Sequence, residues 1–479
     1  MEAEIWLAAS ESRPLAQSGG LADVLRALPD ALSRQGRAVR RFLPAYGFLD
    51  HSAFAAEGPS IPVRLGPALV PAWFLSRREP SGAITTLVEN AELFDREGIY
   101  GPPGGAYPDN ARRFIFFARA VCAWAAQREQ PPALLHVHDW HAAAIPLLLR
   151  HAYPGKNPPK SVLTIHNLGY QGEFGPEAVE WMSLDAAARR HAGREGAFLP
   201  GGGINILRAG ILAADALTTV SPTYAREILT PEFGCGLDGE LQQCAGKLHG
   251  ILNGADYDLW DPVRDAALPR TYDAGSLERK AESSKVLRER FGLSASERPI
   301  LGVVTRLVPQ KGIDVVLRAA EGLLATGADL VVLGSGEQGM VDELERLRAR
   351  HPERMGVYIG YDDPLSHLVI AGSDLLLIPS RYEPCGLTQM YAMRYGTLPV
   401  VTSTGGLVDT VKDASQTGGT GFVMPPHLNE ETLVETVRRA LQVRTSNPDA
   451  WRRLQTTAMA ADFSWDLAAR RYLEIYSHL

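Results

Sequence analysis

The stretch that decides the fold is residues 379–389, which read PSRYEPCGLTQ. It follows the apolar run 375–378 (LLLI), which is typical of a buried parallel strand, and it precedes helix-forming residues at 390–395. Glu383 therefore stands at the carboxyl end of a predicted strand, just before a helix. The first amides of that helix bind anions well, and they belong to Gly386, Leu387 and Thr388. A carboxylate for a polyol beside free amides for a phosphate predicts a sugar–phosphate ligand.

Strands and helices alternate along the chain, which predicts an α/β fold with parallel sheets. In the first half, predicted strands end in polar or small residues, as in LLHVHDW, SVLTIHN and ALTTVSP. The second half starts a new series with PILGVVTRL. Between them lies a segment rich in Asp, Pro and Gly without clear periodicity, NGADYDLWDPVRDAALPRTYDAG. We therefore expect one domain over 1–255, a second over 256–460, and a terminal helix in 461–479 that crosses back to the N-terminal domain.

The composition excludes several classes of protein. A chain of 479 residues with a net charge of −7 shows no general affinity for polyanions, so nucleic acid is not an expected partner. The start MEAEIWLAAS lacks the pattern of a signal peptide, and no apolar run predicts a membrane span. The four cysteines form no CxxC pair, which favours reduced thiols and a cytoplasmic protein. The sequence does not indicate an oligomeric state.

Paired glycines open a predicted helix in each half of the chain. Gly19 and Gly20 lie in SGGLADV, which ends just after Asp23, and TGGLVDT repeats the pattern at 404–410. Two similar domains would each offer a glycine loop to a ligand, because glycine lets the backbone approach closely. A chance match is the alternative, since Gly-Gly-Leu is a common way to begin a helix.

The segment HVHDWHAA concentrates polar side chains at a predicted strand end, namely His136, His138, Asp139 and His141. A metal site is one interpretation, but the first two histidines alternate along a strand and no further cluster completes a ligand set. We therefore expect no metal, and favour a polar strand end that contacts a hydroxylated ligand. Cys385 could be read as a nucleophile, but no base is evident beside it, so packing is the favoured role.

Two cations lie on another predicted strand-to-helix loop. Arg306 and Lys311 belong to TRLVPQKG, where a diphosphate would sit, although a solvated surface pair is the alternative. His166 and Asn167 follow the strand of TIHNLGY, where a purely structural histidine is the alternative. Cations aimed at a departing diphosphate stabilise charge as it develops, and removing one such donor typically costs roughly 3–4 kcal/mol.

The chain resembles the bacterial glycogen synthases of the glycogen/starch synthase family. The match runs nearly end to end, through ESRPLAQSGGLADV, YPDNARRFIFF, HVHDWHAA, TIHNLGYQG, TVSPTYAREI, GILNGADYDLWDP, TRLVPQKGID, PSRYEPCGLTQMYAMRYGTLPVV, TGGLVDTV and FSWDLAARRY. The resemblance implies two Rossmann-like domains with an interdomain cleft, the GT-B glycosyltransferase fold. It also implies a retaining hexosyltransferase that moves glucose from ADP-glucose to the non-reducing end of an α-1,4-glucan such as glycogen, without a cofactor or metal.

The resemblance assigns roles to residues that match the family's motifs. Arg306 and Lys311 would hold the diphosphate and stabilise its departure, and Glu383 would bind the glucosyl hydroxyls. His166 would position the glucose, and Asp139 would lie near the donor glucose or the acceptor hydroxyl. A front-face displacement is implied, in which the leaving phosphate helps to deprotonate the incoming hydroxyl. The other expected substrate contacts are Gln17, Gly19, Gly20, Asp23, Asn167, Asn253, Tyr361, Cys385, Gly386, Leu387 and Thr388.

Two positions depart from patterns known in such enzymes. Many retaining transferases of this fold carry a second Glu eight residues after the first, and this chain has Tyr391 there, as bacterial glycogen synthases do. The family usually has Lys where this chain has Gln17. Two charges about 4 Å apart interact by roughly 4 kcal/mol at an effective dielectric near 20, so losing that cation would slow the enzyme. Arg13 could compensate, the substrates could differ, or the change could be tolerated at modest cost.

Three other functions are compatible with parts of this pattern. One is a related retaining glycosyltransferase with an altered donor or acceptor. Another is a glucan-binding relative with low activity, which Gln17 motivates and the intact Arg306, Lys311, Glu383 and His166 oppose. A pyridoxal-phosphate phosphorylase of the same architecture is the least favoured, because no lysine lies in a recognisable Schiff-base motif.

Overall fold

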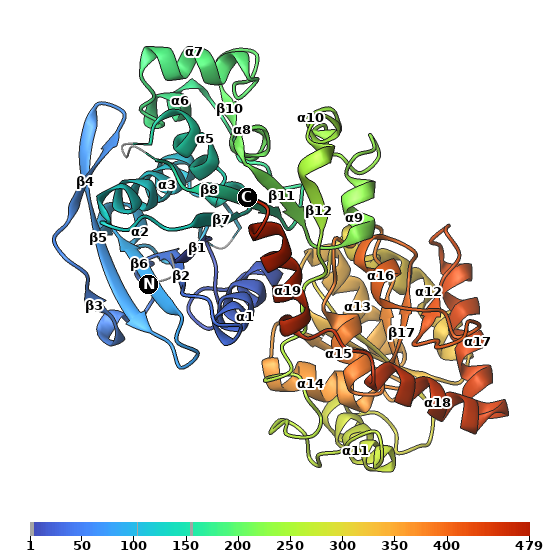
Figure 1. Cartoon of the computed structure of the whole chain (residues 1–479). Helices are drawn as coiled ribbons and strands as arrows, with labels where there is room; N and C mark the ends of the chain where they lie inside the picture. The colour runs from blue at the N-terminus through green and yellow to red at the C-terminus, as the bar shows by residue number, and fades with distance from the viewer. Residues whose placement is uncertain (1–3, 103, 154–156) are drawn as a thin grey trace. The chain divides into compact units, whose positions relative to one another are not determined.

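A computed structural model of the chain describes residues 4–102, 104–153 and 157–479. The chain divides into two compact units (Figure 1). Unit 1 comprises Met1–Gly254 together with Trp465–Leu479, and unit 2 comprises Ala255–Ser464. The boundary expected from the sequence, between residues 255 and 256, lies one residue from this division.

Unit 1 contains a large mixed sheet. Within the described residues it has ten strands, in the order β12-β11-β8-β7-β1-β2-β6-β5-β3, and β4 pairs with β5. Neighbouring strands from β12 to β6 run parallel. A separate two-stranded ribbon joins β9 and β10. The strands are β1 (Ile5–Ala8), β2 (Val39–Pro44), β3 (Ala55–Ala56), β4 (Ile61–Leu65), β5 (Ala68–Arg78), β6 (Ile84–Glu89), β7 (Leu134–His138), β8 (Lys160–Ile165), β9 (Glu173–Phe174), β10 (Ile204–Asn205), β11 (Ala216–Thr219) and β12 (Leu248–Gly250).

Part of the sheet in unit 1 departs from the expectation of parallel sheets. Strand β5 runs antiparallel to β3, β4 and β6. Strands β4 and β5 are joined by only two residues, 66 and 67, which are too few for the crossover that a parallel pair needs. Gly66 supplies the positive φ of 62° in this turn.

Helices cover the sheet of unit 1 (Figure 1). The largest are α1, whose apolar face is buried, and α3, which is buried along most of its length. The helices are α1 (Gly20–Arg34), α2 (Ala91–Phe94), α3 (Asn110–Gln127), α4 (Asp139–Ala142), α5 (Ala144–His151), α6 (Pro176–Trp181), α7 (Ala186–Arg194), α8 (Ile206–Ala213), α9 (Pro222–Glu227), α10 (Asp238–Gln243) and α19 (Trp465–Tyr476), with short 3-10 turns η1 (His51–Ala53) and η2 (Ala245–Lys247).

The C-terminal helix α19 completes the core of unit 1. Its buried face, which includes Trp465, Ala469 and Tyr472, joins the apolar face of α1 and strand β1 in one cluster. Arg34 of α1 also donates to Asp466 of α19 at 2.9 Å. The terminal helix, which we expect from the sequence to return to the N-terminal domain, therefore packs within unit 1.

Unit 2 is built on a six-stranded parallel sheet within the described residues, in the order β15-β14-β13-β16-β17-β18. Its strands are β13 (Ile300–Val304), β14 (Asp329–Gly334), β15 (Met355–Ile359), β16 (Leu375–Ile378), β17 (Leu398–Val401) and β18 (Phe422–Val423). Strands β14 and β17 are buried over their whole length, as expected for strands covered on both faces.

The helices of unit 2 flank this sheet (Figure 1) and bury two apolar clusters against it. They are α11 (Lys280–Phe291), α12 (Ile313–Ala325), α13 (Gln338–Arg350), α14 (Asp363–Gly372), α15 (Thr388–Arg394), α16 (Gly405–Thr410), α17 (Glu430–Ser446) and α18 (Pro448–Met459), with 3-10 turns η3 (Leu277–Arg279) and η4 (Pro309–Lys311). Across the described ranges of both units, no helix combines the length and the apolar character needed to cross a membrane.

Candidate functional site

The predicted phosphate-binding residues of unit 2 lie on loops at one edge of its sheet. Strands β13, β14, β16 and β17 are adjacent and parallel, so the loops that follow them emerge at the same edge. Arg306 and Lys311 follow β13, Tyr361 follows β15, and Glu383 follows β16. This is the edge at which open α/β sheets bind ligands.

Lys311 and Glu383 form an ion pair at this edge. Lys311 Nζ lies 2.6 Å from Glu383 Oε2, and the hydroxyl of Ser380 donates to the same oxygen at 2.9 Å. Both charged side chains are mostly buried, with exposed fractions of 17% and 8%. The pair thus presents a fixed ammonium and a carboxylate side by side.

Glycine at position 312 allows these two loops to meet. Gly312 has a φ of +68°, and a Cβ atom there would lie 1.9 Å from the carbonyl oxygen of Pro379. The backbones are also joined by a hydrogen bond from Arg381 N to the carbonyl of Gln310, at 2.8 Å. The loop that carries Lys311 can therefore approach the loop that carries Glu383 only without a side chain at 312.

The predicted anion-binding amides lie at the start of α15, which begins at Thr388. Gly386 has a positive φ of 72°. Within the described ranges, no acceptor is within hydrogen-bonding distance of the backbone N–H groups of Gly386, Leu387 and Thr388. The thiol of Cys385 is buried, and its backbone packs so closely on Gly406 that a Cβ there would meet the Cys385 carbonyl at 2.2 Å. Cys385 thus shapes the loop through its backbone.

Arg306 and Tyr361 are the exposed members of this edge. The side chain of Arg306 has no acidic partner among the residues that the structure describes. Tyr361 is 62% exposed, and its hydroxyl donates to Asp363 Oδ1 at 2.5 Å. One guanidinium and one aromatic ring are therefore open to solvent at the same edge of the sheet.

In unit 1, a buried carboxylate organises the glycine loop. Glu11 accepts hydrogen bonds from Ser18 N at 2.6 Å, Ser18 Oγ at 2.7 Å and Gly19 N at 3.1 Å. The hydroxyl of Tyr100 donates to the same carboxylate. Burial and the nearby Glu11 carboxylate raise the pKa of Tyr100 well above its usual value, so the phenol stays protonated. Helix α1 begins at Gly20 with Gly19 as its cap, whereas α16 begins at Gly405, so the two glycine pairs differ by one position.

Gln17 and Asp23 lie on either side of this loop. Gln17 is exposed, and Asp23 accepts a hydrogen bond from Arg13 Nη1 at 3.2 Å. Arg13, the cation that could replace the family's lysine, is thus paired with another predicted contact residue.

His166 and Asp139 lie at the ends of neighbouring strands β8 and β7. Asp139 Oδ1 accepts from the backbone N–H of His166 at 2.7 Å, and Asp139 has a left-handed φ of 54°. The ring of His166 is also fixed, because its Nε2 lies 2.9 Å from His138 Nδ1. The structure therefore brings these two predicted residues into direct contact.

Burial controls the protonation of this group. It raises the pKa of Asp139 to about 7, against the opposing effect of backbone N–H groups from His166 and Asn167. It also lowers the pKa of His136, of His141 and of His166 to about 3. Near pH 7 these histidines are neutral, and Asp139 is divided between its two protonation states.

Two predicted asparagines lie on loops of unit 1. Asn167 follows His166, and its side chain accepts from Gly169 N at 3.0 Å. Asn253 is buried, and its side-chain oxygen has no hydrogen-bond partner among the described residues. A buried acceptor without a partner is costly, so Asn253 is suited to receive a donor from a ligand.

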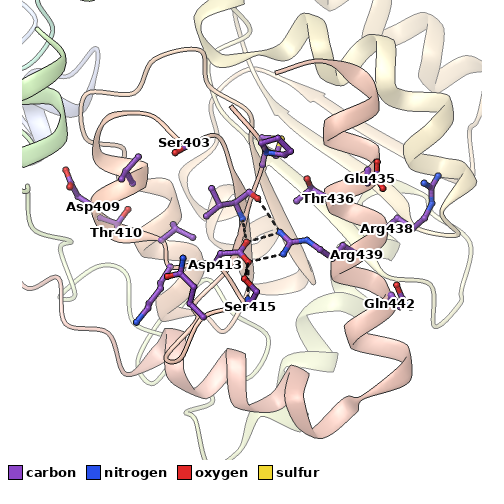
Figure 2. Close-up of a pocket in the computed structure, with 17 residues that line it drawn as sticks. Ser403, Asp409, Thr410, Asp413, Ser415, Glu435, Thr436, Arg438, Arg439 and Gln442 are labelled. Carbon is purple, nitrogen blue, oxygen red and sulfur yellow. Dashed lines mark hydrogen bonds and ion pairs between the residues drawn. The ribbon is translucent and has the colours of Figure 1, made fainter. Parts of the chain in front are cut away.

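A cavity of about 1130 Å³ lies elsewhere in unit 2, between α16 and α17 (Figure 2). Arg439 makes two hydrogen bonds to Asp413 there, at 2.9 and 2.8 Å. Asp413 also accepts from Val423 N, and Arg439 donates to the Val423 carbonyl, so this pair caps the edge strand β18. None of the predicted site residues lines the cavity. We interpret the ion pair as structural.

Several residues at the candidate site were not predicted from the sequence. Glu11 and Tyr100 are 89 positions apart, and only the fold brings them together. Ser380 lies inside a quoted motif, and its position three residues before Glu383 is the signal that could have identified it. No group of three or more His, Cys, Asp or Glu side chains in the described ranges is arranged to hold a metal ion.

Family models match both halves of the chain. Residues 4–243 match the starch synthase catalytic domain, and residues 287–453 match the glycosyl transferases group 1. The chain is 41% identical to a glycogen synthase of Syntrophotalea carbinolica, with 98% of each chain covered. It is 43% identical to a glycogen synthase of Alkalilimnicola ehrlichii, with 99% of this chain and 98% of the other covered.

Solved structures give the same result for the fold. The catalytic domain of starch synthase IV from Arabidopsis thaliana, bound to ADP and acarbose, is similar with a TM-score of 0.91 and 32% identity. That match covers 100% of this chain and 99% of the other. A sucrose-phosphate synthase from Thermosynechococcus elongatus, at a TM-score of 0.64 and 20% identity, shares the fold. The predicted two-domain α/β glycosyltransferase fold is confirmed.

Proposed function

The chain belongs to the glycogen synthase family, and we propose that it transfers glucose from ADP-glucose to the non-reducing end of an α-1,4-glucan, with retention of the anomeric configuration. The ADP and acarbose in the similar starch synthase structure support a nucleotide sugar and a glucan as substrates. We expect no metal or other cofactor to be required.

The observation that carries the proposal is the ion pair between Lys311 and Glu383 beside unpaired helix amides. The 2.6 Å contact fixes a cation for the diphosphate next to a carboxylate for sugar hydroxyls. Arg306, with no acidic partner among the described residues, supplies a second cation. As the bond to the sugar breaks, negative charge grows on the leaving phosphate, and these groups stabilise it without reorganising.

The residues of unit 1 are proposed to act on the transferred sugar and the acceptor. His166 is neutral and contacts the glucose, while Asp139 lies beside it with a pKa of about 7. Asn253 offers a buried oxygen that accepts a sugar hydroxyl. In a front-face displacement, the leaving phosphate oxygen accepts the proton of the incoming hydroxyl, so no protein nucleophile is needed.

A competition experiment tests the donor and the metal requirement. Purified protein is incubated with glycogen and labelled ADP-glucose or UDP-glucose, with and without a chelator. We expect faster incorporation from ADP-glucose and no effect of the chelator. A preference for UDP-glucose would contradict the donor assignment, and loss of activity with the chelator would contradict the absence of a metal.

A matched pair of variants tests the role of Lys311. Lys311→Met should lower kcat by about 100- to 1000-fold, as removal of one charge-stabilising donor does. Lys285→Met is the control, because Lys285 is an exposed lysine of α11 in the same unit. Equal activity of the two variants would contradict the proposed role.

A further inference from the structure

Three histidines of unit 1 lie in a row, and the proposed function uses only His166. His136 and His138 belong to β7 and are fully buried. Their ring centroids lie 4.2 Å apart, and the ring of His138 lies 5.2 Å from that of His166. Two fully buried imidazoles next to a substrate-binding histidine need a physical explanation.

His136 is held by hydrogen bonds at both ring nitrogens. Its Nδ1 lies 2.6 Å from the hydroxyl of Tyr476 on α19, and its Nε2 lies 2.6 Å from Thr164 Oγ1. Thr164 in turn lies 2.5 Å from Thr218 Oγ1. The ring of His136 is therefore fixed, and it packs against His138.

His138 has a partner at only one ring nitrogen. Its Nδ1 lies 2.9 Å from His166 Nε2, and its Nε2 is buried without a partner in the part of the chain that the structure describes. A neutral imidazole carries one proton. If that proton were on Nε2, a buried N–H would be left unsatisfied, whereas an unpaired nitrogen lone pair costs less. The proton of His138 therefore belongs on Nδ1, from which it is donated to His166 Nε2.

This bond determines the tautomer of His166. Because His166 Nε2 accepts, the single proton of the neutral ring must be on Nδ1. That nitrogen has no partner among the described residues, and His166 is only half-buried, so the nitrogen remains available to a ligand. We propose that His138 is a positioning residue that holds His166 as its Nδ1–H tautomer, so that His166 presents a hydrogen-bond donor to a sugar oxygen.

The inference rests on the proposed function for the identity of the ligand, but not for the tautomer. Burial keeps His166 neutral at pH 7, since its pKa is lowered to about 3. A neutral histidine free in water favours the other tautomer, with its proton on Nε2. The structure thus imposes the less common form, and its backbone is fixed at the same time by the bond to Asp139.

Nitrogen NMR of the full chain, labelled with ¹⁵N-histidine, measures the tautomer directly. Protonated and unprotonated ring nitrogens have well-separated ¹⁵N shifts, and the His166→Gln spectrum assigns the signals of His166. We expect a protonated Nδ1 and an unprotonated Nε2 in the wild-type protein. A protonated Nε2 would overturn the proposal. The measurement needs no sugar, so failure of the proposed transferase activity would leave its result unaffected.

Variants then test whether His138 is the cause. His138→Leu removes the donor, so His166 should change to the Nε2–H form and kcat should fall by about 10- to 100-fold, as for other supporting residues of active sites. His138→Asn, whose amide can donate in place of Nδ1–H, should keep the Nδ1–H form and most of the activity. The proposal is wrong if His166 keeps the Nδ1–H form in His138→Leu. It is also wrong if His138→Asn folds and His166 changes to the Nε2–H form in that variant.

Tyr476→Phe is the matched control. It removes the hydrogen bond from α19 to His136 and leaves the His138–His166 bond in place. The tautomer of His166 should not change in this variant. A change would overturn the assignment to His138, because control would then come from α19.

Discussion

Arg306 is an exposed arginine whose proposed role depends on its charge alone. It has no acidic partner among the described residues, so replacing it should not alter the free energy of unfolding. Arg306→Met should lower kcat by about 100- to 1000-fold, because a cation is lost where charge develops. Steady-state kinetics and a thermal melt check both expectations.

Arg453→Met is the matched control, because Arg453 is an exposed arginine of α18 in the same unit. It should behave like the wild-type protein in both measurements. If Arg306→Met were as active as Arg453→Met, Arg306 would not stabilise the diphosphate.

Gln17 occupies the position where the family resemblance leads us to expect a lysine. Gln17→Lys restores a cation beside the glycine loop and should raise kcat, by about tenfold after desolvation is taken into account. Gln127→Lys, at an exposed glutamine that ends α3, controls for the added charge. A Gln17→Lys variant that is unchanged or slower would show that the substitution is already compensated.

At the scale of single residues, the sequence predicted site residues well where they lie in the same motif. It did not predict contacts between residues that are far apart in the sequence and meet only in the folded protein. Glu383 and the backbone amides of Gly386, Leu387 and Thr388 lie within six residues of the sequence, and the sequence predicted them together. Glu11 was missed, because its partner Tyr100 comes from a distant loop and both groups look like ordinary polar residues in the sequence. The tautomer of His166 depends on a contact between two strands, which no sequence pattern encodes.

The 3-10 turn η4 ends at Lys311, and Gly312 follows it with a positive φ and a close contact to the neighbouring loop. Gly312→Ala places a Cβ 1.9 Å from the Pro379 carbonyl, so the loops that carry Lys311 and Glu383 must separate. We expect a loss of stability of about 2–4 kcal/mol and a large fall in activity. Urea unfolding and the transfer assay measure the two effects.

Gly292→Ala is the control that separates the cost of the left-handed backbone conformation from the cost of the steric clash with Pro379. Gly292 has nearly the same φ, +67°, but open space around it. The Gly292→Ala variant should lose only about 1–2 kcal/mol of stability, the cost of a left-handed backbone conformation at a residue other than glycine. It should keep its activity. Equal effects at the two positions would show that the contact with Pro379 is unimportant.

Strands and helices with clear periodicity were predicted well from the sequence. The strands β13 and β16 follow directly from the apolar runs in PILGVVTRL and LLLI. The antiparallel strands β3–β5 were not anticipated. Their direction depends on connections as short as the two residues between β4 and β5, whereas apolar alternation alone does not fix strand direction.

At the scale of the whole molecule, the buried Lys280 of α11 makes stability depend on pH. Burial lowers the pKa of Lys280 from 10.5 to about 7. Between pH 7 and 10 the unfolded chain binds the proton more strongly than the folded one, so stability should rise with pH, by at most about 1.4 kcal/mol per unit. This contribution is lost as the pH falls towards 7.

Lys280→Met should remove this rise, whereas Lys285→Met, at an exposed lysine of the same helix, should keep it. Urea unfolding at pH 7 and pH 9 gives the comparison. Identical pH dependence in the wild-type protein and Lys280→Met would show that Lys280 is charged in the folded state.

The sequence indicated some features of the arrangement into two units but not others. A segment rich in Asp, Pro and Gly indicated the boundary near residue 255, and the amphipathic pattern at the end of the chain indicated a packed helix. The identity of its partner, α1, could not be read from the pattern, because any apolar face would accept such a helix. Family resemblance supplied the substrates, which composition and periodicity alone do not specify.

The most direct test of the central claim is a time course of labelled glucose passing from ADP-glucose into glycogen, followed by digestion with β-amylase. This enzyme releases maltose only from non-reducing ends joined by α-1,4 bonds. The proposed function predicts that the incorporated label is released as maltose. Label that resists β-amylase, or no incorporation by folded protein that still binds glycogen, would contradict it.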